Sequence, residues 1–199
     1  MNAATEWFQR GVARQNAGDV FEAINCYGRA IALGEKSFGV YYNLAFALQA
    51  IGKEDEALAS YAQVVRLNPD FAEAHNNMGN IFLKREQLED AQNSYERALL
   101  NNPNLAQSHF NLGLVLRKRG AWTRAAEHFR AAWQLAPDYV EAWDNLRDAL
   151  SALKRTEESL EAFLAFEKTA QPSSFLVLAG LTTCRFLGDF EREKRYLEL

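Results

Sequence analysis

Residues 109–137 read HFNLGLVLRKRGAWTRAAEHFRAAWQLAP, and this stretch decides the fold of the 199-residue chain. Apolar residues recur at helical spacing on both sides of Gly120, and Pro137 ends the second stretch. A helix breaker between two amphipathic stretches is typical of a helix, a tight turn and a second helix. The segment is therefore predicted to form a helical hairpin.

The same segment recurs through the chain with a period of 34 residues. Each copy has a small residue, then a turn residue, an alanine, and an aromatic residue four positions after the alanine. The small residues are Gly11, Ala45, Gly79 and Gly113; the turn residues Gly18, Gly52, Glu86 and Gly120; the alanines Ala23, Ala57, Ala91 and Ala125; the aromatic residues Tyr27, Tyr61, Tyr95 and Phe129. The period divides the chain into repeats 4–37, 38–71, 72–105, 106–139 and 140–173, a partial repeat 174–199, and an N-terminal tail 1–3.

Stacking of these hairpins follows from their apolar faces. A two-helix hairpin cannot bury both faces alone, so each repeat covers its neighbour. The sequence predicts an all-α structure, a single curved array over 4–199, with the first helices of the repeats on its inner wall. Gly79 and Ala91 are expected where the helices of one repeat approach most closely, and Tyr95 is expected to fill the space towards the next repeat.

Helix starts are also predicted. Asp70 follows a proline and precedes Glu73, and Asp138 stands in the same relation to Glu141. An acidic N-cap residue with glutamate three positions later satisfies the free amides of a first turn. Asp70 and Asp138 are therefore the predicted N-cap residues.

The pattern resembles the tetratricopeptide repeat family, which the second and fourth repeats follow well. The matching residues are Tyr41, Leu44, Ala45, Leu48, Ala57, Tyr61 and Pro69, and then His109, Leu112, Gly113, Leu116, Ala125, Phe129, Ala132 and Pro137. The match weakens at Arg147, Ser159, Phe166 and Glu193. The resemblance implies an α-solenoid with a right-handed superhelix, made of five full repeats and a partial sixth, that acts in protein binding.

Composition excludes several classes of function. The net charge of −4 argues against nucleic-acid binding, which depends on basic residues facing phosphate. The longest apolar run, 175–181, is far shorter than the roughly 20 residues of a membrane span, so no membrane association is expected. Cys26 and Cys184 form no disulfide framework, which favours a reducing, cytoplasmic location.

Neither a catalytic constellation nor a cofactor motif is predicted, so we expect the chain not to be an enzyme. His75 and His109 occupy a repeat position that elsewhere holds Trp7, Tyr41 and Trp143. This is a packing position, and no Glu-x-x-His or paired-cysteine spacing supplies a ligand set for these histidines or for His128. No metal site is therefore expected.

One carboxamide side chain recurs on the first helix of four repeats, at Asn43, Asn77, Asn111 and Asn145. Asparagine is a mediocre helix former, so its recurrence inside helices needs a reason. Its amide has both a donor and an acceptor and could bind the C=O and N–H of a peptide ligand. The alternative is that these amides bond to neighbouring helices.

Nearby positions on the same helices define the character of the predicted groove. They are Tyr42, Phe46, Asn76, Asn80, Phe110, Leu114, Arg117, Asp144 and Asp148. The early positions are aromatic, the third repeat is rich in amides, and the fifth is acidic, so a ligand with apolar side chains and a basic segment would suit the surface. The alternative for the charged positions is a solvated helix face.

Three functions are compatible with this sequence. The first is a scaffold that binds an extended peptide or disordered segment in the groove. The second follows from a resemblance between the asparagine ladder and that of O-GlcNAc transferase-type repeat arrays, and implies a substrate-recruiting N-terminal region of a larger enzyme. The third is a homo-oligomer assembled through an uncapped C-terminal end, where five apolar residues would be partly exposed: Phe175, Leu176, Leu178, Leu181 and Phe186.

Overall fold

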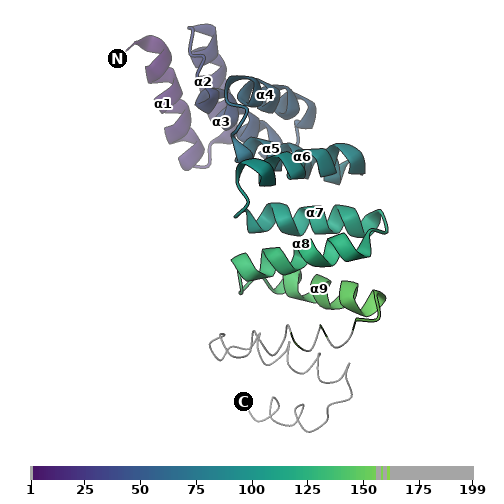
Figure 1. Cartoon of the computed structure of the whole chain (residues 1–199). Coiled ribbons are helices and arrows are strands. Elements are labelled where there is room, and N and C mark those ends of the chain that lie inside the picture. Colours follow the sequence, from purple (N-terminus) through teal and green to yellow (C-terminus); the bar gives the residue numbers. More distant parts are fainter. Residues whose placement is uncertain (1, 156–157, 159–160, 162–199) are drawn as a thin grey trace, which may run out of the picture. The chain divides into compact units, whose positions relative to one another are not determined.

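The computed structural model describes residues 2–155, 158 and 161, and those residues form α-helices joined by short turns, with no strand among them (Figure 1). This confirms the predicted all-α helical repeat structure. The chain divides into two compact units, Met1–Pro103 and Asn104–Leu199.

The first unit contains three helical hairpins. Its helices are α1 (Ala3–Asn16), α2 (Val20–Ala32), α3 (Phe38–Ala50), α4 (Glu54–Leu67), α5 (Ala72–Lys84) and α6 (Leu88–Asn101). Helices α1 and α2, α3 and α4, and α5 and α6 pack as pairs. Adjacent hairpins meet through α2 with α3 and α4 with α5, which covers the apolar face that each hairpin leaves open.

The described part of the second unit contains α7 (Ala106–Lys118), α8 (Trp122–Leu135) and α9 (Val140–Ala152). Helix α8 packs against both α7 and α9. The predicted partial repeat 174–199, with its expected exposed residues, lies outside the described residues. The single array over 4–199 therefore stays a prediction.

The turn inside each hairpin uses a left-handed residue, as the recurring glycines predict. Gly18, Gly52 and Gly120 have φ angles of 80°, 79° and 77°. Glycine adopts this conformation without the steric cost that a Cβ brings. Glu86, the exception in the sequence pattern, takes the same conformation with a φ of 59°. The turn geometry is thus kept even where the glycine is missing.

The core of each hairpin combines the repeated alanine with the aromatic residue that follows it. Ala91 and Tyr95 are both 0% exposed, as are their counterparts in the other hairpins. The aromatic rings lie over the glycine of their own first helix: a Cβ on Gly11 would be 2.5 Å from Tyr27, and one on Gly113 would be 2.6 Å from Phe129. The expectation that the ring fills the space towards the next repeat was incomplete, because its closest approach is within its own hairpin.

The predicted N-cap residues are wrong. The N-cap of α5 is Phe71 and that of α9 is Tyr139, each one residue after the predicted aspartate, and neither has a side-chain cap hydrogen bond. The aspartate belongs instead to the turn that precedes the helix. Side-chain caps do occur in the first hairpin, where Asn2 accepts from the Thr5 amide at 2.8 Å and Asp19 accepts from the Glu22 amide at 3.3 Å.

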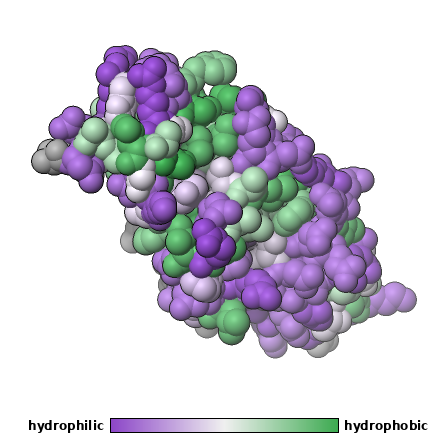
Figure 2. Space-filling view, turned by 90° about the horizontal axis from the view of Figure 1, so that it is seen from above, coloured by the Kyte–Doolittle hydropathy of each residue, from purple (hydrophilic) through white to green (hydrophobic). Residues whose placement is uncertain are grey.

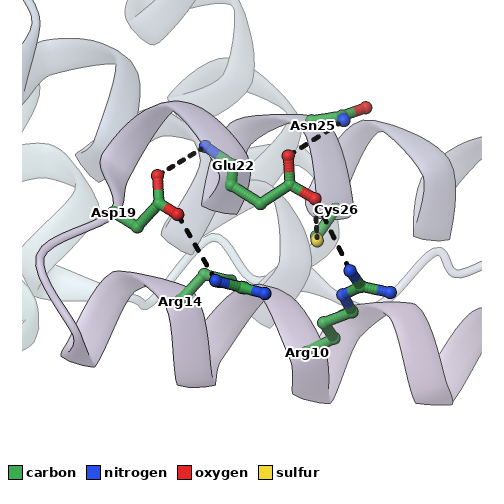
Figure 3. A network of polar contacts seen from close by, with 6 residues as sticks. All are labelled: Arg10, Arg14, Asp19, Glu22, Asn25 and Cys26. Atoms are coloured by element: carbon green, nitrogen blue, oxygen red, sulfur yellow. Dashed lines mark hydrogen bonds and ion pairs between the residues drawn. The ribbon is translucent and has the colours of Figure 1, made fainter.

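The first hairpin differs from the others on one face. At the positions of Arg10 and Arg14, the next four repeats have apolar residues: Leu44, Met78, Leu112 and Leu146, and Leu48, Phe82, Leu116 and Leu150. Figure 3 shows how α1 and α2 satisfy this polar face: Arg10 pairs with Glu22 at 3.9 Å and Arg14 with Asp19 at 3.5 Å. The Arg10 and Arg14 side chains are about half exposed, at 51% and 45%.

No helix in the described part of the chain is long and apolar enough to cross a membrane.

Candidate functional site

An aromatic cluster surrounds Tyr42, which lies on α3 in the first unit. The ring of Tyr42 on α3 lies 5.0 Å from the ring of Phe71, 6.0 Å from that of Tyr61 and 6.5 Å from that of Phe46. Burial raises the pKa of Tyr42, so its hydroxyl stays protonated at neutral pH. Phe46 is 49% exposed. The predicted residues Tyr42 and Phe46 thus lie together and expose apolar surface.

Exposed apolar side chains are also found elsewhere on the molecule. They include Phe21, Leu33 and Leu100. In the view of Figure 2, hydrophobic side chains reach the surface in patches between hydrophilic ones. The aromatic cluster on α3 is therefore marked out by its neighbouring carboxamides rather than by apolar exposure alone.

Two of the predicted ladder residues lie beside this cluster. Asn77 on α5 donates from Nδ2 to the Tyr42 hydroxyl at 3.4 Å, and Asn76 donates to the Asn77 Oδ1 at 3.3 Å. Asn43 on α3 is half-buried, and its amide makes no hydrogen bond within the described part of the chain. The first unit thus combines an unengaged carboxamide with a weakly engaged one.

Asn80, also predicted to face a ligand, has an internal role. Its Oδ1 accepts a hydrogen bond of 2.8 Å from the buried Tyr95 hydroxyl. In the first two hairpins the corresponding acceptors are Gln15 for Tyr27, at 2.7 Å, and Gln49 for Tyr61, at 2.9 Å. The third repeat has Leu83 at the position of those glutamines, so Asn80 satisfies the hydroxyl instead.

In the second unit, Asn145 bonds from helix to helix. Arg117 on α7 donates to its Oδ1, and its Nδ2 donates to the Glu141 carbonyl at 2.7 Å. Arg117 occupies the position of Gln15 and Gln49, but the fourth repeat has Phe129, whose ring has no hydroxyl to satisfy.

The other predicted residues of the second unit are packed or paired. Asn111 is 9% exposed. The ring of Phe110 lies 4.8 Å from that of Tyr139, and Leu114 is half-buried. Arg147 pairs with both Asp144 and Asp148 at 3.1 Å, which offsets part of the negative charge predicted for this segment.

Two features of the molecule were not predicted. His128 on α8 lies against His109 on α7, with 3.0 Å between their Nδ1 atoms. A cleft of about 340 Å³ is lined by residues of α4, α5 and α6, among them Val65, His75 and Arg97. The sequence contains a signal for the histidine pair. The position three residues after the repeated alanine holds His128 in the fourth repeat and smaller residues in the other repeats.

The comparisons with known proteins agree with this structure. A "Tetratricopeptide repeat" model matches residues 76–140 and a "TPR repeat" model matches residues 50–85. Both models describe repeats, and neither describes a catalytic domain. No curated protein sequence matches the chain.

Several solved structures are similar to the chain in fold. Pseudomonas aeruginosa pilF has a TM-score of 0.72 at 18% identity, with 98% of this chain and 88% of that one covered. MamA from Desulfovibrio magneticus RS-1 has a TM-score of 0.72 at 18% identity, with 84% and 95% covered. YrrB, described as a TPR protein with an unusual peptide-binding site, has a TM-score of 0.69 at 20% identity, with 89% and 96% covered. The chain therefore contains tetratricopeptide repeats, recognised over residues 50–140.

Proposed function

We propose that the chain is a protein-interaction scaffold that binds an extended peptide or a disordered segment through the first helices of its repeats. The observation that carries the proposal is Asn43. Its carboxamide is partly accessible, makes no hydrogen bond within the described residues, and follows Tyr42 directly in the aromatic cluster. Leaving a polar group without a protein partner is inexpensive only where water or a ligand can satisfy it.

The chemistry of these side chains suits a peptide. A carboxamide can donate to a peptide C=O and accept from a peptide N–H, independently of the ligand's sequence. The exposed ring of Phe46 adds apolar surface for a ligand side chain. YrrB, a similar fold, is a protein with a peptide-binding site. We place the ligand across Asn43, Tyr42, Phe46 and Asn77 in the first unit.

Two other predicted carboxamides contribute differently under this proposal. Asn145 and Asn80 hold neighbouring side chains, so they shape the surface and contribute less binding energy. The early part of the predicted site, within α3 and α5, is therefore its principal part.

The test is selection from a phage-displayed library of random peptides, followed by affinity measurement with the selected peptides. Asn43→Ala removes a side chain without breaking an internal hydrogen bond, so the fold should be unaffected. We expect at least tenfold weaker binding for Asn43→Ala combined with Asn77→Ala, which is about 1.4 kcal/mol. The matched control is Asn93→Ala, which removes an exposed asparagine from α6, the second helix of the third hairpin. Equal binding by all these variants would show that the carboxamides do not contact the peptide.

The remaining functional hypotheses stay predictions. Both the substrate-recruiting region of a larger O-GlcNAc transferase-like enzyme and the homo-oligomer depend on the end of the chain, and residues 174–199 lie outside the described part. A cytoplasmic location also belongs to the proposal, and it is supported by the free, buried thiol of Cys26.

A further inference from the structure

The side chains of His109 and His128 face each other across the α7–α8 hairpin. Their Nδ1 atoms are 3.0 Å apart, and their ring centroids are 5.2 Å apart with 34° between the planes. A neutral imidazole has only one N–H. In the pair, one Nδ1 therefore donates and the other accepts, and one proton lies between two nitrogen atoms that are otherwise good metal ligands.

The repeat itself shows that packing does not require this pair. Equivalent positions on the two helices hold Trp7 with Cys26, Tyr41 with Ser60, and His75 with Ser94. In these three hairpins the residue on the second helix is small and almost fully buried. Among the first four repeats, only the fourth places an imidazole on the second helix opposite the ring on the first helix.

We propose that His109 and His128 form a two-histidine site for a divalent transition metal ion of the nickel or copper type. With metal–nitrogen distances of about 2.1 Å, two ligands at a right angle are about 3.0 Å apart, whereas tetrahedral ligands are about 3.4 Å apart. The observed separation fits neighbouring positions of a square-planar or octahedral ion. Metal binding requires each ring to turn its Nδ1 lone pair away from the N···N line, by about 45° for ligands at a right angle, towards a common point.

Proton balance is simple for this site. Both rings bind through bare Nδ1 atoms, so the proton between them is lost to solvent. The ring that gave it up takes a proton at Nε2 and stays neutral. Within the described residues, no group of three or more His, Cys, Asp or Glu side chains could hold a metal ion, so the proposal assigns only the two imidazoles as protein ligands. Protonation of either imidazole competes with the metal ion, so binding should weaken as the pH falls.

The test is calorimetric titration of untagged protein with Ni²⁺ alone, at pH 7.5 and again at pH 5.5. His128→Ser recreates the His75 and Ser94 pair of the third hairpin, so the helices should pack as before. We expect this variant to bind Ni²⁺ at least tenfold more weakly than the wild type. His109→Tyr, which keeps a ring as Tyr41 does, should show the same loss.

His75→Ser is the matched control, since it removes a histidine outside the pair and should leave the affinity unchanged. Electron paramagnetic resonance of the Cu²⁺ form should show two imidazole nitrogen ligands in the wild type and at most one in His128→Ser. Equal Ni²⁺ affinity of the wild type and His128→Ser, or no binding by the wild type, would overturn the proposal.

Discussion

The ring of Tyr95 lies against the backbone of Gly79 so closely that a Cβ on that glycine would be 2.7 Å from the tyrosine Cε1. No ordinary Cβ contact is that short. Tyr95 is fully buried, so its ring cannot move away without disturbing the hairpin. The absence of one methyl group thus sets how closely α5 and α6 approach.

Gly79→Ala should lower the free energy of unfolding by about 1–3 kcal/mol, because it overpacks a filled core. The second repeat has Ala45 at this position, which shows that a hairpin can form with alanine there when its helices are spaced for it. Gly79→Val should cost more. Urea denaturation measures the effect, with Gly39→Ala as the control, since a Cβ at Gly39 makes only ordinary contacts. Equal stability of the Gly39 and Gly79 variants would contradict this account.

The turn glycines should show a purely conformational effect. A Cβ on Gly52 meets nothing within 4 Å, but its φ is 79°. Gly52→Ala should therefore destabilise the protein by about 1–2 kcal/mol through backbone strain. Gly28→Ala, at an exposed helical glycine that also has open space, should stabilise it by up to about 1 kcal/mol. Thermal unfolding of both variants should show midpoint shifts of opposite sign; shifts of the same sign would argue against the strain.

The hydrogen bond between Tyr95 and Asn80 should be measurable as a coupling energy. Tyr95→Phe removes the donor, and Asn80→Ala leaves the buried hydroxyl without this acceptor; we expect each to cost about 1 kcal/mol or more. The double variant should cost less than the sum, by about 1 kcal/mol. A double-mutant cycle in urea tests this. Strict additivity would mean that Asn80 does not hold the hydroxyl.

Acid should weaken the contact between α4 and α5. Hydrogen bonds from Lys84, at 2.6 Å, and from Arg85, at 2.8 Å, lower the pKa of Glu54 below its ordinary value of 4.5. Because the folded-state pKa is the lower one, the stabilisation is present above pH 4.5 and is lost as the pH falls through the folded value. Glu54→Gln should therefore be less stable than the wild type at pH 7, and this difference should shrink towards pH 3. A difference that is constant from pH 7 to pH 3 would rule the charge out as the cause.

The helical repeat could be predicted from the sequence because its signals recur. The period of 34 residues is carried by residues whose roles are local: a turn, a close approach and a filled core. Repetition also predicts the backbone at Glu86, where the residue type alone would not indicate a left-handed turn. Its three glycine counterparts have the same geometry.

Partners of individual side chains could not be predicted in the same way. The N-caps were displaced by one residue because the aspartates fit the preceding turn as well as they fit a cap. Arg117 bonds to Asn145 because Phe129 has no hydroxyl that needs an acceptor at the Arg117 position. Asn80 bonds to the Tyr95 hydroxyl because the Leu83 side chain has no acceptor atom. Each outcome depends on the combination of residues at two or three positions, and not on one residue type alone. The ladder was therefore predicted as four equivalent residues, although their environments differ.

The ion-paired face of α1 and α2 has a practical consequence. Where the next four repeats have leucine, methionine or phenylalanine, the first has Arg10 and Arg14, whose side chains are about half exposed. Residues 3–32 can therefore be grafted before the first hairpin of a designed repeat array whose N-terminal face is apolar. They should cover that face and keep the designed array monomeric without any redesign of its interior.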